Sequence, residues 1–418
     1  MEALPQVNAT PIQPSLDRTL PLRVLTLNCW GLKFISKHRP GRIRAIGRAL
    51  TAGTADIVAL QEVWVEEDYQ TLRTLVASRL PYAHRFLSGI LGGGLVILSK
   101  YPIIESEFRP YSLSGSPTRF YHGDWFVGKG IGRCRILHPE LGPLDILNTH
   151  FHAEYGKSYP YAAERAAQAW EVGKALRACT ATTILMGDFN LVEDTLPYQI
   201  IRALVPARDA WAIKHPRPLD QPSGSGSLEP WEQARNLGIT SDAPDSTWRG
   251  SDKVGLGERL DYIWVRDEAV GIKQVSVAFT DRVLSLNCSF SDHFAVEATL
   301  EMTPGLPLPG AITTLPPKAA DAPIHELREA LALHQQEVEG LQQRWYLFAL
   351  LCLVFWAGMV VCGGVVRTRG LGSLWVVLGG IALLVAEAFL WFGLLWASKE
   401  GYVARSMMQD VDMYLSRP

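Results

Sequence analysis

The feature that most constrains the fold is a pair of apolar runs near the end of this 418-residue chain. The first, residues 345–366, is an uncharged stretch of about 22 residues, which is long enough to span a bilayer as a helix. The second, residues 371–397, follows after a short polar segment. Because both runs are long, adjacent and late in the chain, we predict two transmembrane helices joined as a hairpin rather than two buried core helices.

Basic residues on either side of the hairpin predict its orientation. Two lie between the spans and four flank their other ends: Arg367 and Arg369 against Arg344, Lys399, Arg405 and Arg417. Since cytosolic segments carry the excess of Lys and Arg, the larger part of the chain is expected in the cytosol. The absence of an apolar signal core from the N-terminal residues agrees with this. We expect an integral membrane protein of the endoplasmic reticulum, with the mitochondrial outer membrane as the alternative.

The rest of the sequence divides by composition. Residues 1–21 are polar and Pro-rich and are expected to be a disordered tail, whereas 22–302 alternates short apolar runs with helical patterns. The Pro-rich stretch 303–323 cannot continue a sheet and is interpreted as a linker. Residues 324–344 predict a juxtamembrane helix, and 398–418 are expected to be a tail.

The juxtamembrane helix carries a seam of residues at three-four spacing. Its members are Ile324, Leu327, Leu331, His334, Val338, Leu341 and Trp345. Such a seam is typical of a coiled coil, which would make the protein a homodimer. An amphipathic helix lying against the domain or the membrane explains the spacing equally well, and the polar His334 weakens the coiled-coil interpretation.

Short apolar runs within 22–302 predict strands of a sheet. They are RVLTLN (23–28), DIVALQ (56–61), GGLVILS (93–99), LDILNTH (144–150), TTILMGDF (182–189), LDYIWV (260–265) and AVEATLEM (295–302). They show little polar alternation, so we expect both faces of the sheets to be covered. Residues 42–53 and 161–178 predict helices, and the Pro-, Gly-, Ser- and Asp-rich residues 214–257 predict a long surface loop. The pattern indicates an α/β domain.

Polar residues stand at the ends of these strands. In chain order they are Asn28, Glu62, His150, Asp188, Asn190, Asp261, Asp292 and His293. A single Asp or His at a strand end is more often a cap or a surface group. As a set, however, side chains at one edge of a sheet can converge in one site.

The chemistry of this set is coherent. Carboxylate and amide oxygens suit Mg²⁺, and Glu62, Asn28 and Asp292 are the expected ligands. Histidine accepts a proton near neutral pH, so His293, oriented by Asp261, is the candidate general base for attack of water on phosphorus. The six cysteines show no paired spacing, which argues against zinc.

The remaining candidates have supporting roles. Asn190 and His150 are expected to donate hydrogen bonds to phosphate oxygens as charge develops there. Asp188 is expected to hold the attacking water or a second metal ion. Asp292 is counted with the catalytic residues as well as with the ligands.

The order of these motifs resembles the endonuclease/exonuclease/phosphatase superfamily, which is related to pancreatic deoxyribonuclease. The resemblance spans about residues 22 to 302. It implies a four-layer α/β/β/α sandwich and magnesium-dependent cleavage of phosphate esters at these residues. It leaves the substrate open, since members cut DNA, RNA, inositol phosphates or sphingolipids.

Longer stretches resemble one group within that superfamily. LNCWGLKFISKHRPGRIRAIGRAL, HGDWFVGKG and HFHAEY are similar to neutral sphingomyelinase type 1 and to fungal inositol phosphosphingolipid phospholipases C. The resemblance implies release of ceramide from a membrane sphingolipid, with choline or inositol as the headgroup, and activation by anionic phospholipids. A tethered nuclease or inositol phosphate phosphatase is the alternative, and a catalytically dead scaffold is a third. The net charge of −2 does not favour a nucleic-acid partner.

The stretch HGDWFVGKGIG (122–132) nearly matches a nucleotide-binding loop. Gly123, Gly128 and Lys129 fit G-x-x-x-x-G-K, but Gly130 replaces the Ser or Thr that holds magnesium. The residues that follow predict a strand, whereas a nucleotide loop opens a helix. The resemblance instead implies a loop for substrate engagement and catalysis, with Asp124 as its acidic residue and Lys129 as its lysine. Either the two form a pair that gates the site, or Lys129 contacts the lipid phosphate. A plain surface ion pair between them would contribute little.

Overall fold

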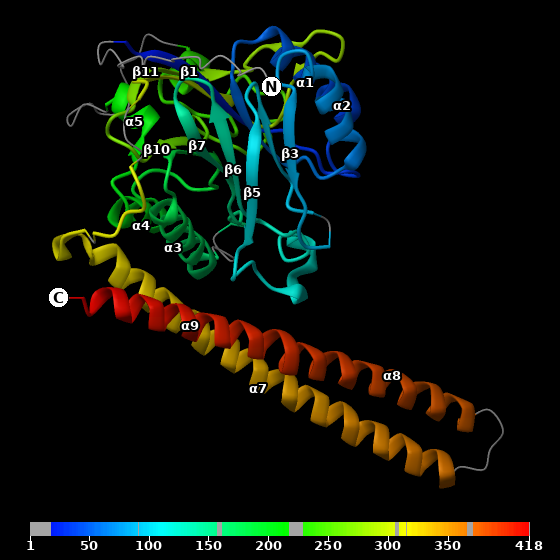
Figure 1. Cartoon of the computed structure of the whole chain (residues 1–418). Helices are drawn as coiled ribbons and strands as arrows, with labels where there is room; N and C mark the ends of the chain where they lie inside the picture. Colours follow the sequence, from blue (N-terminus) through cyan, green and yellow to red (C-terminus); the bar gives the residue numbers. More distant parts are fainter. Residues whose placement is uncertain are drawn as a thin grey trace, which may run out of the picture.

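The computed structural model describes residues 18–90, 92–156, 161–216, 229–305, 309–314, 316–365 and 371–417 (Figure 1). Several predictions fall partly on other residues. They concern residues 1–17 of the predicted tail, 217–228 of the predicted loop, 306–308 and 315 of the linker, and Arg367 and Arg369 between the spans, all of which lie outside the described residues.

Two six-stranded sheets form the N-terminal domain. The first has the order β11-β14-β1-β2-β4-β3, with β1 (Leu20–Asn28), β2 (Ile57–Gln61), β3 (Tyr82–Phe86), β4 (Leu95–Ser99), β11 (Gly271–Ala278) and β14 (Ala295–Met302). The second has the order β5-β6-β7-β8-β10-β9, with β5 (Ile103–Pro110), β6 (Gly130–His138), β7 (Gly142–His150), β8 (Thr182–Asp188), β9 (Arg208–Asp209) and β10 (Asp261–Val265). The hairpin β12 (Arg282–Val283) and β13 (Cys288–Ser289) is separate.

The sheets stack face to face, and helices cover their outer faces (Figure 1). Val24 and Ile97 of the first sheet meet Ile146 and Ile184 of the second in a core between the sheets. Helices α1 (Arg39–Ala52) and α2 (Glu66–Val76) pack on the first sheet, and α3 (Ala162–Ala178) and α4 (Leu196–Leu204) pack on the second. Both faces of the central strands are therefore apolar and buried. The predicted four-layer α/β/β/α sandwich is confirmed.

The predicted strands all occur, but edge elements were missed. β5, IIESEFRP, exposes most of its charged side chains on an outer edge, so it lacks the apolar run by which a buried strand is recognised. β1 begins at Leu20, inside the predicted tail, because Leu20 pairs with Met302 of β14. The predicted loop 214–257 contains helix α6 (Pro230–Asn236), and the short helices α5 (Ala210–Lys214), η1 (Pro117–His122) and η2 (Lys318–Ala320) were also not predicted.

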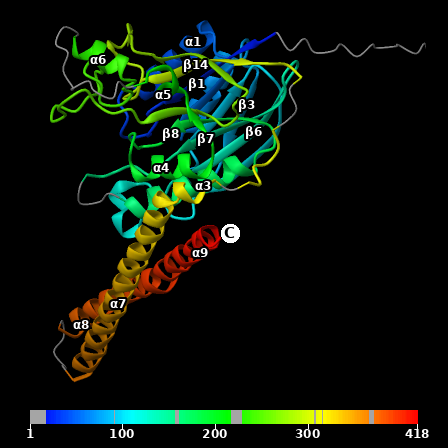
Figure 2. The same ribbon diagram turned by 90° about the vertical axis from the view of Figure 1, so that its left-hand side faces the viewer.

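The C-terminal part forms a long helical hairpin. Helix α7 (Ala322–Val365) joins the predicted juxtamembrane helix and first span without a break. Helix α8 (Leu371–Trp391) returns, continues through a π-helical turn (Phe392–Ala397) and ends as α9 (Ser398–Leu415), where only a tail was predicted. Both helices are long and apolar enough to cross a membrane. The hairpin projects away from the domain (Figure 2).

The π-helical turn has a local cause. Such a turn releases a backbone carbonyl from the regular helical pattern. Here the Gly393 carbonyl accepts a hydrogen bond from Gln342 Nε2 of α7 at 2.8 Å. A side chain at Gly393 would collide with Tyr346, since a Cβ there would lie 2.7 Å from its ring. The turn therefore locks the two helices together where they leave the apolar runs.

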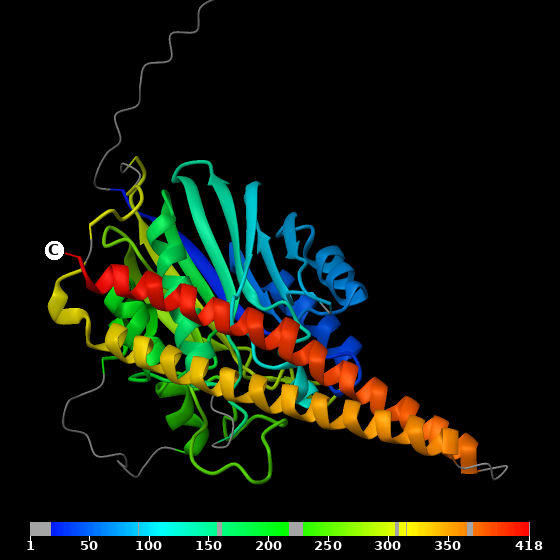
Figure 3. The ribbon, with the colours of Figure 1, turned by 90° about the horizontal axis from the view of Figure 1, so that it is seen from below.

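The seam of α7 packs within the chain. Ile324, Leu327 and Leu331 are fully buried against α3 and α4, together with Met407 and Val411 of α9. From below, α7 and α9 cross the face of the domain that α3 and α4 form (Figure 3). The amphipathic-helix interpretation therefore describes this packing, and these seam residues are not free to pair with a second copy.

His334, the polar member of the seam, lies between two carboxylates. Its Nδ1 is 3.9 Å from Glu164 of α3, and its Nε2 is 3.6 Å from Glu400 of α9. Burial lowers the pKa of His334, but the two carboxylates outweigh this and raise it above its usual value. A histidine in an apolar seam is therefore explained by charged partners on both neighbouring helices.

Candidate active site

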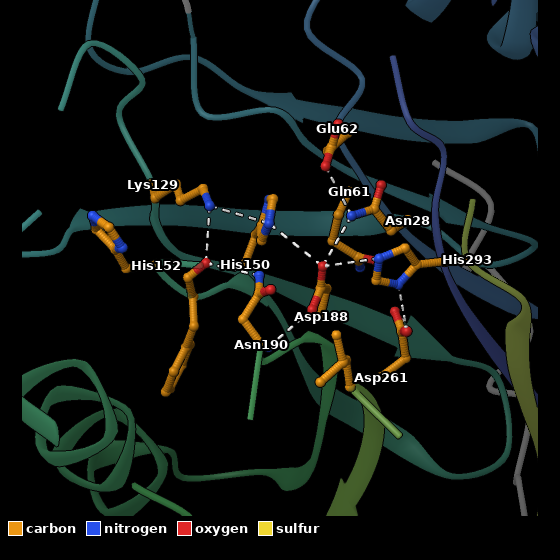
Figure 4. A network of polar contacts seen from close by, with 12 residues as sticks. Asn28, Gln61, Glu62, Lys129, His150, His152, Asp188, Asn190, Asp261 and His293 are labelled. Carbon is orange, nitrogen blue, oxygen red and sulfur yellow. Dashed lines mark hydrogen bonds and ion pairs between the residues drawn. The ribbon is translucent and has the colours of Figure 1, made fainter. Parts of the chain in front are cut away.

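Strand register brings the predicted residues to one edge of the sandwich. In the first sheet Asn28 pairs with Gln61, at the ends of the parallel strands β1 and β2. In the second, His150 pairs with Asp188, and Asp188 pairs with Asp261. Residues far apart in sequence therefore share one edge, because neighbouring strands end at the same level. Figure 4 shows the resulting cluster.

The turns that follow these strands are conformationally unusual. Trp30, Glu62 and Asn190 have φ angles of 48°, 57° and 47°. Asn tolerates this left-handed region, whereas Trp and Glu adopt it at a cost of roughly 1–3 kcal/mol each. The turns also approach closely, since a Cβ on Gly31 would lie 2.0 Å from the Glu62 carbonyl oxygen. Only glycine fits there, and the strain is maintained by the packed sheets.

Asn28 connects the two sheets at the centre of the site. Its Nδ2 donates to Glu62 Oε1 at 3.0 Å and to Asp188 Oδ2 at 2.9 Å (Figure 4). Its Oδ1 accepts from the Trp30 backbone N–H at 2.9 Å, which fixes the orientation of the amide. The Asp292 side chain is tied to the same strand end, because Ser291 Oγ contacts both Asp292 Oδ1 (3.1 Å) and the Asn28 carbonyl oxygen (2.6 Å).

His293 and Asp261 form a buried pair. His293 Nδ1 lies 2.8 Å from Asp261 Oδ2, and its Nε2 faces Asp188 Oδ2 at 4.0 Å (Figure 4). Burial alone would lower the pKa of His293, but Asp261 and Asp188 raise it well above the usual value. The pair fixes the imidazole with Nε2 directed toward Asp188. This is the geometry of a base held by a carboxylate.

The buried carboxylate of Glu62 has too few hydrogen bonds to balance its negative charge. Its Oε2 is buried and makes no hydrogen bond within the part of the chain that the structure describes. Burial and the neighbouring Asp292 carboxylate raise the pKa of Glu62 to about 7, and burial raises that of Asp292 as well. Like-charged, desolvated carboxylates are costly unless a cation neutralises them. The donor set fits a hard divalent cation.

A second group of side chains could also hold a metal ion. Asp188, Asp261 and His293 place ligand atoms within 4.8 Å of one another. Asp261 Oδ2 is engaged by His293 and Asp188 Oδ2 by Asn28. Among the described residues, Asp261 Oδ1 and Glu62 Oε2 are both buried without a hydrogen bond, so each group of side chains has one free oxygen. The Glu62–Asp292 side offers carboxylate oxygens alone, which a hard cation prefers to a histidine nitrogen, and it therefore fits a cation better.

The predicted substrate-loop residues Asp124 and Lys129 reach the same site from the loop between η1 and β6. Lys129 Nζ lies 2.5 Å from Asp124 Oδ1 and 3.2 Å from His150 Nε2, and it donates to the Phe151 carbonyl at 2.9 Å. Asp124 and Lys129 are only 4% and 5% exposed, so the interpretation as a surface ion pair is wrong. Gly130 begins strand β6 rather than a helix, which excludes the nucleotide-loop geometry as expected.

Histidine 150 lies between this loop and the cluster of carboxylates. Its Nε2 is 3.5 Å from Asp188 Oδ2 (Figure 4). Burial and the nearby Lys129 ammonium hold the pKa of His150 well below its usual value, so its imidazole is neutral. Asn190 lies on the same side, with Nδ2 donating to the Phe151 carbonyl at 3.2 Å. The structure thus brings together all ten residues predicted for the site.

Several supporting residues were not predicted. Gln61 Nε2 donates to Asn148 Oδ1 at 2.7 Å and so joins the two sheets beneath the site. Tyr155 donates to Asp124 at 2.6 Å, and buried Arg42 donates to the backbone carbonyls of Cys29 and Phe290. A polar residue inside an otherwise apolar strand was the available signal for Gln61, in DIVALQ, and for its partner Asn148, in LDILNTH.

The sequence matches the Endonuclease/Exonuclease/phosphatase family over residues 25–293. This range contains every predicted site residue, all of the second sheet, and the first sheet apart from β14 and the start of β1. The chain belongs to this family. The predicted family is thus confirmed, and with it the expectation of an enzyme that cleaves phosphate esters.

Curated relatives are similar over most of the chain. The inositol phosphosphingolipids phospholipase C of Schizosaccharomyces pombe is 39% identical, over 69% of this chain and 70% of the relative. The enzyme of the same name from Saccharomyces cerevisiae is 33% identical, over 72% and 68%. Sphingomyelin phosphodiesterase 2 of Mus musculus is 33% identical, over 75% and 73%. The resemblance to the sphingomyelinase and phosphosphingolipid phospholipase C group is confirmed.

Proposed function

We propose that this protein is a membrane-anchored, magnesium-dependent phospholipase C that cleaves sphingolipids into ceramide and a phosphorylated headgroup. The observation that carries the proposal is the His293–Asp261 pair beside buried carboxylates, in a chain similar to enzymes named for this reaction. The apolar hairpin supports a substrate that already resides in a membrane.

The proposed reaction begins with a water molecule between His293 and the substrate phosphorus. His293 Nε2 removes a proton from this water as its oxygen bonds to phosphorus, and the bond from phosphorus to the ceramide oxygen breaks. Asp261 holds His293 Nδ1 and stabilises the imidazolium that forms. Asp188 lies 4.0 Å from Nε2, where it can orient the water. The ceramide oxygen takes up a proton from solvent as it leaves, His293 returns its proton to solvent, and the headgroup keeps the phosphate.

The other side of the phosphate faces hydrogen-bond donors. Lys129 Nζ and Asn190 Nδ2 both donate to the Phe151 carbonyl, and Lys129 Nζ also donates to His150 Nε2 (Figure 4). Lys129 and Asn190 therefore hold their N–H groups beside the cluster, and His150 orients the ammonium. Donors held in place before reaction stabilise the charge that develops on the phosphate oxygens. Glu62 and Asp292, with Asn28, would hold the Mg²⁺. When bound, the ion would supply positive charge to the phosphate and the leaving oxygen.

The membrane setting belongs to the same proposal. We place the domain on the cytosolic side of the endoplasmic reticulum, with the mitochondrial outer membrane as the alternative. Anionic phospholipids are proposed as activators through basic residues that flank the hairpin, such as Arg405 of α9. Homodimerisation would have to use a surface other than the buried seam of α7.

A substrate panel tests the proposed function. The purified full-length chain, reconstituted in vesicles with Mg²⁺, is given labelled sphingomyelin, inositol phosphoceramide, an inositol phosphate and DNA. We expect release of the water-soluble headgroup from at least one sphingolipid and no cleavage of the other two. Hydrolysis of DNA or the inositol phosphate alone would favour the nuclease or phosphatase alternatives, and no hydrolysis of any substrate would favour the inactive scaffold.

The buried Asp124–Lys129 pair gives a specific prediction. Lys129→Ala should lower turnover by about 10²-fold, because a preorganised donor beside His150 is lost. The substitution also leaves the buried Asp124 carboxylate without its partner, so part of the lost turnover would come from a less stable protein. The double variant Asp124→Asn/Lys129→Met removes both charges. We expect it to recover most of the melting temperature but not the turnover, and recovery of turnover would reduce Lys129 to a structural role.

A further inference from the structure

An apolar groove lies beside the candidate site. It has a volume of about 430 Å³, in the range of small-molecule sites. Its apolar walls are Leu32, Phe34, Ile35, Trp64, Val65 and Val127. Lys33, Glu66 and Glu67 supply the charged part of its lining. None of the residues that we place in catalysis lines it, so it is a separate feature of the fold.

Each wall of the groove continues from a turn that carries a site residue. Leu32 follows the turn after Asn28, and Trp64 follows Glu62 by two positions. Val127 precedes Lys129 by two positions. The ring of Trp64 lies 6.4 Å from that of His150, centroid to centroid. A molecule that places its phosphate against His150 and Lys129 would therefore have the groove immediately beside it.

The loop that forms the outer wall exposes large apolar side chains. Phe34 is 93% exposed and Ile35 is 69% exposed, on a turn closed by the Ser36 N–H bonding to the Leu32 carbonyl at 3.0 Å. Neighbouring Lys33 and Lys37 are also exposed. An ordered turn with aromatic and aliphatic tips beside lysines is suited to the boundary between lipid headgroups and acyl chains.

The groove also lies near the place where the hairpin becomes apolar. Trp125, two residues before Val127, packs against the cluster of Val338, Trp345 and Trp396. Trp345 begins the first apolar run, and tryptophan is enriched where helices enter a membrane. The same loop thus contacts the base of the hairpin and forms one wall of the groove, which places the groove close to the expected bilayer surface.

We propose that this groove, bounded by Leu32–Ile35, Trp64–Val65 and Val127, binds one hydrocarbon chain of the lipid substrate while the tip Phe34–Ile35 enters the membrane. The inference rests on the proposed sphingolipid substrate and adds a subsite to it. The groove would hold the first part of a chain drawn out of the bilayer, with the phosphate between His150 and His293. Substrate selection would then depend on the chain as well as on the headgroup.

Photo-crosslinking locates the chain directly. The full-length protein in phosphatidylcholine vesicles is mixed with sphingomyelin or inositol phosphoceramide that carries a diazirine in its acyl chain, with a chelator present so that the lipid is not consumed. After irradiation, we expect adducts on peptides that contain residues 32–35, 64–65 or 127. Adducts confined to α7 and α8, or joining two copies of the chain, would overturn the proposal.

A charge in the groove gives a kinetic test. Leu32→Glu should lower kcat/KM for the long-chain lipid at least tenfold relative to kcat/KM for a nitrophenyl ester of the same phosphorylated headgroup, which has no chain. The matched control is Ile213→Glu, on the distant helix α5, where the wild-type residue is 50% exposed (Figure 1). We expect the control to keep the wild-type ratio.

The two proposals fail differently. If the wild type releases headgroup from a sphingolipid but Leu32→Glu keeps the wild-type ratio, the groove proposal is wrong and the proposed function stands. If the wild type releases none, the proposed function is wrong and the sphingolipid-chain subsite is wrong with it.

Discussion

Replacing His293 with alanine is expected to lower kcat by about 10³-fold, the typical contribution of a positioned general base. The reason is geometric, since His293 is held by Asp261 at 2.8 Å and directs Nε2 toward Asp188. The measurement is initial-rate hydrolysis of the sphingolipid that the wild type prefers, with circular dichroism to show that the fold is retained. A variant that keeps more than a tenth of wild-type turnover would remove His293 as the base.

The same residue predicts a pH dependence with opposite signs for activity and stability. A base must be neutral, and the two carboxylates raise the pKa of His293, so the acid limb of the pH–rate profile should lie above pH 6.5. For stability, a raised histidine pKa contributes fully below its unfolded value and is lost as pH rises through its folded value. His293→Ala should therefore cost more stability at pH 6 than at pH 9.

Asp261→Asn tests whether the Asp261 carboxylate sets the pKa of His293, because it removes the charge and keeps the size of the side chain. Without the carboxylate, the pKa of His293 should fall and the acid limb should move to lower pH, even though kcat falls as well. An unchanged limb would show that another group governs the profile.

The second large effect is expected at Glu62. Glu62→Gln should raise the Mg²⁺ concentration for half-maximal activity by tenfold or more, because it removes the carboxylate that best fits the ion. The measurement that does not depend on activity is the melting temperature with and without Mg²⁺. A ligand that binds the folded state stabilises it by mass action, and the variant should lose most of that gain.

Without metal, the sign of the stability effect reverses. Burial and Asp292 raise the pKa of Glu62 from 4.5 to about 7. The folded state therefore holds this proton more tightly, which costs nothing below pH 4.5 and on the order of 3 kcal/mol above pH 7. At pH 8 and without metal, Glu62→Gln should be at least as stable as the wild type. A less stable variant with undiminished metal affinity would place the ion elsewhere, with Asp188, Asp261 and His293 as the alternative set.

The core of the fold was predictable because its strands are apolar on both faces. DIVALQ is buried from end to end and TTILMGDF is buried after Thr182, so both runs stand out from their surroundings. β5 and β11 were missed because edge strands alternate charged and apolar residues and make much of their pairing through the backbone. Helix α9 was missed for a different reason. Its apolar residues Met407, Met408 and Val411 are buried only because α9 packs against α3 and α7, which the local sequence does not show.

The sequence predicted which residues form the site, but not how their side chains contact one another. Polar residues after apolar strands identified Asn28, Glu62, Asp188 and His293, because strand ends of one sheet edge must converge. The sequence could not show that Lys129 is buried against His150, since their contact depends on how the loop from η1 folds back. It also gave no spacing signal for Arg42, whose guanidinium fixes backbone carbonyls from two separate turns.

The most direct test of the central claim is hydrolysis in ¹⁸O-water. The wild-type enzyme in vesicles with Mg²⁺ is given its preferred sphingolipid, and both products are analysed by mass spectrometry. Attack of water on phosphorus, activated by His293, predicts ¹⁸O in the phosphorylated headgroup and none in ceramide, with the signal absent for His293→Ala. Label in ceramide, or equal labelling by the variant, would contradict the account.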